Sequence, residues 1–175
     1  MSLAVRQMAT VAKMSFIDIK EKHYKEVTRI YEQGIKTGIA TFETSVPNWN
    51  KWNASHLNFG RIAYTENLKI LGFATLSPTS TRKVYAGVAE VSIYVDEKER
   101  GKGIGKKLLL QLIKTSEQNG IWTLQASIMD ANQLSIKLHT GCGFRIVGYK
   151  EKIGNLNGVW LNNTILERRS KIIGQ

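Results

Sequence analysis

The spacing of apolar and polar residues predicts three helices along the chain. From Lys22 to Lys36 the apolar residues recur at helical spacing, and Gly38 provides a stop. From Gly103 to Asn119 a leucine-rich face predicts a second helix, which ends at Gly120. A third and shorter helix is predicted from Asn132 to Thr140. The segments between these helices follow other patterns.

These segments have the patterns of strands and loops. Ile39 to Gly60 is rich in aromatic residues with weak periodicity, so we expect a loop and a short helix there. Thr65-Glu66-Asn67-Leu68 joins two strand patterns and predicts a hairpin. Six strands are predicted in all, over Arg61–Tyr64, Lys69–Leu76, Val88–Val95, Trp122–Ile128, Phe144–Lys150 and Val159–Glu167. Strands and helices in this order predict an α/β fold, a mixed sheet flanked by helices.

Length and composition fit one globular domain. The 175 residues suffice for one well-cored domain, and 42% apolar with 22% charged residues exclude global disorder. We expect a leader over 1–14, disordered or partly derived from cloning, a domain over 15–169 and a tail over 170–175. No apolar run approaches the roughly 18 residues of a membrane span, and no signal peptide is recognised. The single cysteine, Cys142, fits a reducing cytoplasm.

The charge is strongly positive. The chain has 25 Lys and Arg against 14 Asp and Glu, a net charge of +11, which favours an anionic partner. Nucleic acid, a membrane surface and a phosphorylated small molecule all meet that condition. The one local concentration of cations comprises Lys98, Arg100, Lys102, Lys106 and Lys107. This clustering favours a small anionic ligand over a polyanion, so we expect neither a nucleic-acid nor a membrane partner.

The cation cluster surrounds a glycine-rich turn. The strand pattern that ends at Val95 is followed by Arg100-Gly101-Lys102-Gly103-Ile104-Gly105 and then by the leucine-rich helix. Glycines let backbone N–H groups approach a phosphate closely, and the helix dipole adds attraction. A nucleotide-hydrolase loop is excluded because Lys107 stands where Ser or Thr is needed, and the glycine spacing does not match a dinucleotide fingerprint. A tight turn with a solvated charged face remains the alternative.

Several motifs together resemble a known family. Arg100-x-x-Gly103-x-Gly105, Asn132-x-x-Ser135-x-x-Leu138-His139 and Gly143-Phe144 resemble the acetyl-CoA site of the GNAT N-acetyltransferase superfamily. The phosphinothricin and methionine sulfoximine N-acetyltransferase branch is matched further by Ala40-Thr41-Phe42-Glu43-Thr44, Arg82-x-x-Tyr85, Glu90 and Gly158-x-Trp160. The resemblance runs from about Phe16 to Arg168. It implies the GNAT fold, in which two parallel strands of a mixed sheet splay apart.

The resemblance implies acetyl-CoA as co-substrate. The pantetheine arm is expected between the strands Val88–Val95 and Trp122–Ile128, and the pyrophosphate on amides of the glycine-rich turn. The implied coenzyme-binding residues are Ile93, Tyr94, Val95, Arg100, Gly101, Lys102, Gly103, Ile104, Gly105, Lys106, Asn132 and Ser135. For Asn132, the alternative is that it merely caps the helix.

The resemblance also implies direct transfer of the acetyl group to an amine. An ammonium has no lone pair, so a base must first remove a proton, and Glu90 is the carboxylate at the implied position. His139 stands where many members have a Tyr that protonates the departing thiolate. Its alternative is a packed, hydrogen-bonded histidine. A backbone N–H near Ile93 is expected to stabilise the oxyanion.

The implied substrate is a small amino-acid analogue acetylated on its α-amine. Its expected contacts are Phe42, Glu43, Thr44, Arg82 and Tyr85, the last two for an acidic end. Leu156 and Asn162 depart from a Lys and an Asp that relatives often have, so the exact amine stays open. The resemblance implies a homodimer. No metal site is expected, because the three histidines lack neighbouring carboxylates or thiolates at ligand spacing.

Three alternatives to this function stay open at the level of sequence. The enzyme could acetylate a protein N-terminus or a polyamine, although Arg82 and Tyr85 argue against polyamines, which have no carboxylate. The chain could be a nucleic-acid binder that uses its charge, with affinity that falls steeply with salt. It could also be an acyl-CoA-binding module without catalysis, in which Glu90 would be dispensable.

Overall fold

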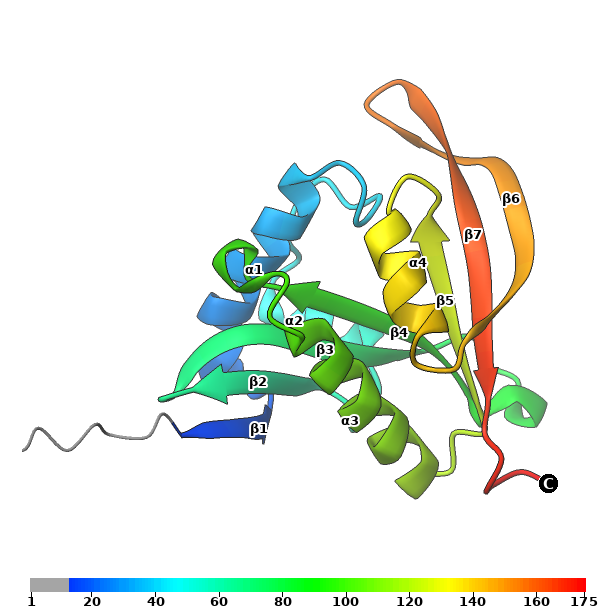
Figure 1. Cartoon of the computed structure of the whole chain (residues 1–175), viewed down its shortest axis with the longest axis horizontal. Coiled ribbons are helices and arrows are strands. Elements are labelled where there is room, and N and C mark those ends of the chain that lie inside the picture. The colour runs from blue at the N-terminus through cyan, green and yellow to red at the C-terminus, as the bar shows by residue number, and fades with distance from the viewer. Residues whose placement is uncertain (1–12) are drawn as a thin grey trace, which may run out of the picture.

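A seven-stranded sheet organises the protein, seen in a computed structural model that describes residues 13–175 (Figure 1). The leader expected over 1–14 therefore lies almost wholly outside the described residues, and Met14 is the first residue of a strand. The elements are β1 (Met14–Asp18), α1 (Tyr24–Lys36), α2 (Trp49–Ser55), β2 (Ile62–Glu66), β3 (Lys69–Pro78), β4 (Val88–Val95), α3 (Ile104–Gln118), β5 (Thr123–Met129), α4 (Gln133–Thr140), β6 (Arg145–Leu156) and β7 (Val159–Arg169), with 3-10 turns η1 (Glu21–His23), η2 (Lys83–Tyr85) and η3 (Glu97–Glu99).

The strand order is β1-β2-β3-β4-β5-β7-β6, and every neighbouring pair is antiparallel except β4 with β5. The predicted α/β fold with a mixed sheet and splayed parallel strands is confirmed. The predicted hairpin between β2 and β3 is also confirmed, with Asn67 and Leu68 at positive φ in the turn. A parallel pair requires a crossover, which the chain makes through α3.

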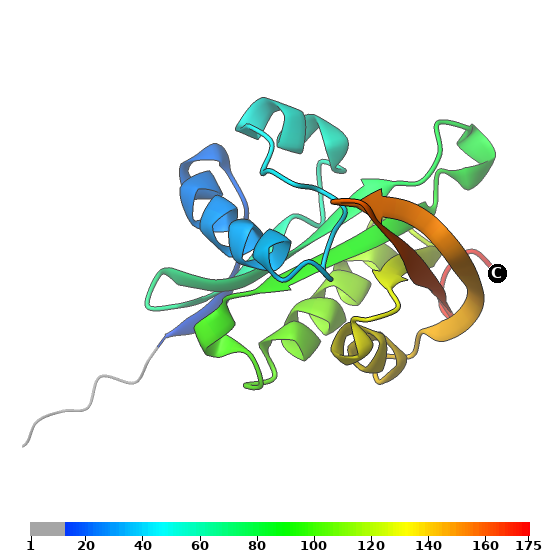
Figure 2. The same cartoon turned by 90° about the horizontal axis from the view of Figure 1, so that it is seen from above.

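Two helices cover each face of the sheet, so the core has two parts. Figure 2 shows α1 and α2 on one face, with α3 and α4 on the other. The smaller part contains Val27, Ile30 and Trp52 from α1 and α2 against Phe73 of β3. The larger part packs the leucine-rich face of α3 onto the opposite face, and these leucines are fully buried. Strand β3 is covered on both sides, which explains its nearly continuous apolar sequence.

The structure adds two features to the predicted elements. Strand β1, which the pattern does not predict, pairs with β2 at the edge of the sheet. Strand β6 extends to Leu156, and the two-residue turn Asn157-Gly158, both at positive φ, joins it to β7. This long hairpin curls back toward the loop after α1 (Figure 2). Among the described residues, no helix combines the length and apolar character that crossing a membrane demands.

Candidate active site

The two parallel strands in the middle of the sheet separate. Strands β4 and β5 pair over three positions, of which Glu90 with Gln125 is the last. On its other side, β4 continues to pair with β3 as far as Val95 with Gly72. The edge of β4 from Val91 to Val95 therefore has no strand partner on this side. An open strand edge presents backbone donors and acceptors that an extended amide-containing ligand can bind.

The glycine-rich turn lies directly at the start of α3. Gly101 and Gly103 have φ of 78° and 77°, and Gly103 is the N-cap residue of the helix. Among the described residues, no protein acceptor receives the backbone N–H groups from Gly101 to Lys106. Unpaired N–H groups at a helix N-terminus form an anion site, to which the helix dipole contributes. The geometry therefore fits a phosphate group at this turn.

Side chains of helix α1 bind the residues that precede this turn. The carboxylate of Asp96 is buried, pairs with the guanidinium of Arg29 and accepts the N–H of Lys98 at 3.0 Å. Gln33 Oε1 accepts the N–H of Glu97 at 3.0 Å. Burial alone would raise the pKa of Asp96, but the hydrogen bonds from Arg29 and Lys98 outweigh it and hold that pKa below its usual value. These contacts hold the backbone in place just before the glycine-rich turn.

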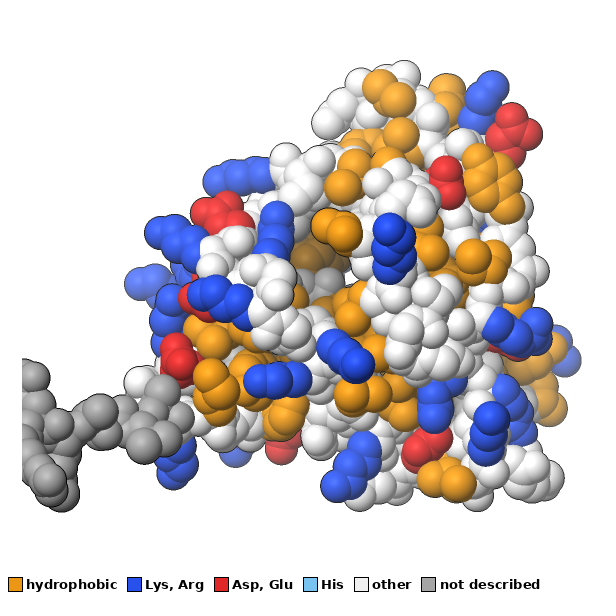
Figure 3. All heavy atoms as spheres, viewed as in Figure 1, with side chains coloured by type: hydrophobic (Ala, Val, Ile, Leu, Met, Phe, Trp, Pro, Cys, Tyr) orange, Lys and Arg blue, Asp and Glu red, His pale blue; other side chains and the backbone are white. Residues whose placement is uncertain are grey.

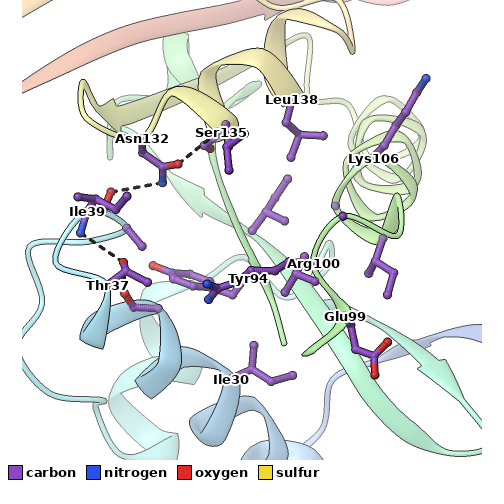
Figure 4. Close-up of a pocket in the computed structure, with 18 of the residues that line it drawn as sticks. Ile30, Thr37, Ile39, Tyr94, Glu99, Arg100, Lys106, Asn132, Ser135 and Leu138 are labelled. Atoms are coloured by element: carbon purple, nitrogen blue, oxygen red, sulfur yellow. Dashed lines mark hydrogen bonds between the residues drawn. The ribbon is translucent and has the colours of Figure 1, made fainter. Parts of the chain in front are cut away.

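A cavity of about 470 Å³ connects the glycine-rich turn with the open edge of β4 (Figures 3 and 4). Figure 3 shows it as a hollow between the α1 side and the α4 side. Of the residues expected to bind the coenzyme, its lining includes all except Lys102, namely Ile93, Tyr94, Val95, Arg100, Gly101, Gly103, Ile104, Gly105, Lys106, Asn132 and Ser135. The structure therefore brings together residues of β4, of the glycine-rich turn and of the start of α4.

The cations around the turn differ in their contacts. Lys102 Nζ donates to Glu99 Oε2 at 2.8 Å, and Glu99 lines the cavity whereas Lys102 does not. Lys107 Nζ lies 5.0 Å from the ring centre of Tyr64 and donates to its hydroxyl at 3.1 Å. Arg100 and Lys106 line the cavity. The positive charge at this turn is therefore partly balanced, with two of the expected cations facing the ligand space.

Asn132 caps α4 and also ties the loop after α1 to that helix. Its Oδ1 accepts the N–H of Ser135 at 3.2 Å, and its Nδ2 donates to the carbonyl of Ile39 at 3.3 Å (Figure 4). The capping role is therefore present. A contact with the coenzyme stays a prediction for both Asn132 and Ser135.

A second cavity, of about 280 Å³, lies along the same open edge of β4, closer to the point where β4 pairs with β5. It shares the wall residues Ala40, Ile93, Tyr94, Asn132 and Ser135 with the first cavity. Its other lining residues are Thr41, Phe42, Glu43, Glu90, Val91, Ser92, Ser127, Ile128, His139 and Asn163. Because these walls are shared, the two cavities adjoin each other along the open edge of β4.

Glu90 lies where β4 and β5 separate, and its carboxyl group faces the second cavity. Burial raises the pKa of Glu90 above its usual value, while a backbone hydrogen bond from Ser127 and the charge of Lys150 oppose that rise. A carboxylate with a raised pKa is a stronger base than an exposed one. The position and the environment therefore suit proton abstraction.

His139 lines the same cavity and is only 3% exposed. Its Nδ1 lies 2.8 Å from the carbonyl of Ser135, so Nδ1 must donate, and its Nε2 is buried without a partner. Burial lowers the pKa of His139, and the bond to Ser135 opposes that change. The neutral ring therefore has an unpartnered acceptor at Nε2. Protonation of a thiolate by His139 would require the disfavoured imidazolium, and this role stays a prediction.

The expected substrate residues divide into two groups. Phe42 and Glu43 line the second cavity, and the ring of Phe42 packs against Gly154 of the curled hairpin, where a Cβ would come within 2.5 Å of it. Thr44, Arg82 and Tyr85 are exposed and line neither cavity. Arg82 instead lies 5.4 Å from the ring centre of Tyr85, next to η2. Substrate contacts by these three residues stay predictions.

Asn163 is a cavity residue that the sequence pattern does not single out. It lies in β7, is 7% exposed and donates from Nδ2 to Ser127 Oγ at 2.7 Å. The available signal was the polar run Asn162-Asn163-Thr164 inside a strand that is otherwise largely apolar. Asn162 has a different role, since its Oδ1 accepts the N–H of Lys152 at a bulge of the hairpin.

This fold and site define a class of protein, the acyl-coenzyme A-dependent transferases with a split mixed sheet. A family model described as Acetyltransferase (GNAT) family matches residues 24–144. The chain belongs to this family. Among the described residues, no group of three or more His, Cys, Asp or Glu is arranged to hold a metal ion.

Named relatives in the family act on amino-acid analogues. The chain is 34% identical over 99 residues to L-methionine sulfoximine/L-methionine sulfone acetyltransferase of Pseudomonas paraeruginosa, a match that covers 57% of this chain and only 58% of the relative. It is 30% identical over 157 residues to phosphinothricin N-acetyltransferase of Alcaligenes faecalis, covering 86% and 79%. The crystal structure of a phosphinothricin acetyltransferase from Sinorhizobium meliloti in complex with AcCoA is 26% identical, with a TM-score of 0.80 and coverage of 92% and 95%.

Proposed function

We propose that the protein transfers an acetyl group from acetyl-CoA directly to the α-amine of a small amino-acid analogue of the phosphinothricin, methionine sulfoximine or methionine sulfone type. The observation that carries this proposal is the wall shared by the two cavities. The glycine-rich turn lines the first cavity, Glu90 lines the second, and the two cavities have five lining residues in common. A donor on one side and an amine on the other would meet there.

The first cavity fits acetyl-CoA in its chemistry. The unpaired amides from Gly101 to Lys106, with Arg100 and Lys106 beside them, suit the pyrophosphate. The open edge of β4 suits the amide groups of the pantetheine arm. Acetyl-CoA supplies the acetyl group as a reactive thioester when it is bound.

Glu90 serves as the general base in this proposal. An amine in neutral water is mostly an ammonium, which has no lone pair and cannot attack. The carboxylate of Glu90 takes the proton, directly or through a water, at the point where β4 and β5 separate. Its raised pKa brings the carboxyl group closer to the range in which a base is most effective.

The substrate class rests on the named relatives and on the second cavity. Phe42 provides an apolar wall and Glu43 a charge within its lining. At Leu156 and Asn162 the chain lacks charges that the family resemblance leads one to expect, which changes the charge of the hairpin near the amine-bearing ligand. We expect the amine to differ in detail from that of the named relatives for this reason.

The test of the proposed function follows thiol release from acetyl-CoA across a panel of amines. We expect turnover with phosphinothricin, L-methionine sulfoximine or L-methionine sulfone. Turnover only with a peptide N-terminus or a polyamine would contradict the substrate class while leaving the enzyme class intact. Binding of acetyl-CoA without transfer to any amine would favour a non-catalytic module, and a gel shift with nucleic acid tests the remaining alternative.

As part of this proposal, we expect the protein to form a homodimer, to bind no metal and to be located in the cytoplasm. Support for a homodimer comes from the β6–β7 hairpin, whose exposed apolar side chains are Ile146, Val147, Tyr149, Ile153, Val159 and Trp160. Clusters of this kind often become buried on association. Light scattering of the purified protein measures the oligomeric state.

Gly154→Ala is expected to disturb the second cavity selectively. A Cβ at this position would lie 2.5 to 3.0 Å from the ring of Phe42, so the ring must move, and overpacking costs about 1–3 kcal/mol. We expect a lower melting temperature and a raised KM for the amine, with the KM for acetyl-CoA nearly unchanged. The matched control is Gly148→Ala in the same strand, where a Cβ meets nothing within 4 Å. Equal effects of the two variants would refute a specific contact with Phe42.

A further inference from the structure

Unpartnered polar atoms concentrate in the second cavity. Among the described residues, three buried side-chain atoms have no hydrogen-bond partner, namely Thr75 Oγ1, His139 Nε2 and Asn163 Oδ1. His139 and Asn163 both line the second cavity, whereas Thr75 lines neither cavity. Buried polar atoms are nearly always partnered in folded proteins, and one without a partner destabilises the fold. Two such atoms in one cavity point to a ligand that satisfies them.

Both of these atoms are acceptors. The Nδ1–H of His139 donates to the Ser135 carbonyl, which leaves Nε2 of the neutral ring with a lone pair. The Nδ2 of Asn163 donates to Ser127 Oγ, which leaves Oδ1 free. Each of these two atoms therefore lacks a hydrogen-bond donor.

Ser127 lies between Asn163 and Glu90. Its hydroxyl accepts from Asn163 Nδ2 at 2.7 Å, and its backbone is close enough to the carboxyl group of Glu90 to oppose the rise in the pKa of that group. Glu90, His139 and Asn163 come from β4, α4 and β7, and all three line one cavity of about 280 Å³. The cavity thus offers three acceptor groups from three separate elements.

We propose that Asn163 is a further substrate-binding residue. Its Oδ1 and the Nε2 of His139 accept hydrogen bonds from the acceptor amine, which lies beside the Glu90 carboxylate. This inference rests on the proposed function and deepens it. A primary ammonium has three N–H donors, one for each of Glu90, His139 and Asn163. The match selects primary amines, because an N-methyl amine loses one donor and adds bulk.

Asn163→Leu tests the inference, since leucine is branched at Cγ as asparagine is and has no acceptor. The KM for L-methionine sulfone is expected to rise by about tenfold or more, with the KM for acetyl-CoA within about twofold of the wild type. The preference for L-methionine sulfone over its N-methyl derivative should narrow. Thermal stability is expected to change little, because loss of the hydrogen bond from Asn163 to Ser127 Oγ offsets removal of the unpartnered Oδ1.

Thr75→Val is the matched control, because it removes the third unpartnered atom, which lies outside both cavities. It should leave both KM values unchanged. Asn163→Asp keeps an acceptor oxygen and should retain more amine binding than Asn163→Leu. This comparison also tests the inference if the leucine variant folds poorly. An unchanged amine KM in Asn163→Leu would overturn the inference and indicate that an ordered water satisfies these atoms.

A second readout separates this inference from the proposed function. L-methionine sulfone is titrated into the complex of the protein with CoA, and the ¹⁵N resonances of the His139 ring and the Asn163 side chain are followed. Shifts of both resonances support the inference even when the wild type shows no turnover. Absence of these shifts at saturating amine overturns it, whether or not thiol release is seen.

Discussion

Glu90→Gln is expected to lower kcat/KM for the amine by about 10²- to 10⁴-fold, the range that general-base catalysis contributes. Glutamine keeps the size of the side chain and its ability to accept a hydrogen bond from Ser127, but it cannot take a proton. The KM for acetyl-CoA should change little, because Glu90 lines only the second cavity. Thiol release at saturating acetyl-CoA measures the effect. Glu151→Gln, at an exposed position of β6, is the control for loss of one carboxylate.

The pH dependence gives this prediction a second test. Burial raises the pKa of Glu90 above 4.5, and only the ionised form is a base, so wild-type kcat/KM should rise with pH as Glu90 ionises. The Ser127 hydrogen bond and the charge of Lys150 limit the shift, and Glu43 and His139 line the same cavity. The glutamine variant should lack this rising limb. A variant with the wild-type profile would exclude Glu90 as the base.

Glu90→Gln should keep or raise the thermal stability of the protein although it lowers its activity. A carboxyl group whose pKa is raised by folding contributes stability below its unfolded pKa, and that contribution is lost as the pH rises through the folded pKa. At neutral pH the buried carboxylate of Glu90 is therefore a cost to the folded state. We expect Glu90→Gln to melt at an equal or higher temperature than the wild type at pH 7. Thermal unfolding at two pH values measures this difference.

The sequence pattern predicts those elements that bury a continuous apolar face. Strand β4 has the predicted bounds Val88–Val95, and α3 differs by one residue at each end, because both contribute to the core. Strand β1 was not predicted because it is a five-residue edge strand, exposed or half-buried throughout. Strand β6 was predicted too short, because its side chains are largely exposed and its apolar pattern fades after Lys150.

In the site, local features follow from the sequence pattern, whereas features that depend on the tertiary structure do not. The glycine-rich turn is a local feature, so its positive φ values and unpaired amides follow from neighbouring residues. The second cavity depends on the separation of β4 from β5 and on the register of β7, which no local pattern encodes. Asn163 reaches Ser127 only through that register. The state of the His139 ring is set by the Ser135 carbonyl and by burial, which the sequence does not show.

Gly103→Ala is expected to raise the KM for acetyl-CoA by about 10- to 100-fold, which corresponds to about 1.4–2.8 kcal/mol of lost binding. Gly103 has φ of 77°, where an alanine costs about 1–2 kcal/mol and tends to rotate out of this conformation. That rotation would turn the unpaired amides of the turn away from a phosphate, and the new Cβ would stand at the anion site. The KM for the amine should stay nearly constant.

The matched control is Gly120→Ala at the other end of α3. Gly120 has φ of 79°, and neither glycine has an atom within 4 Å of an added Cβ, so both variants carry the same backbone strain. Both should lose similar melting temperature, while only Gly103→Ala impairs use of acetyl-CoA. Acetyl-pantetheine, which lacks the pyrophosphate, should be used equally well by the wild type and by Gly103→Ala. An equal loss with both donors, or an equal loss in Gly120→Ala, would show that the turn does not bind phosphate, because strain alone would then explain the change.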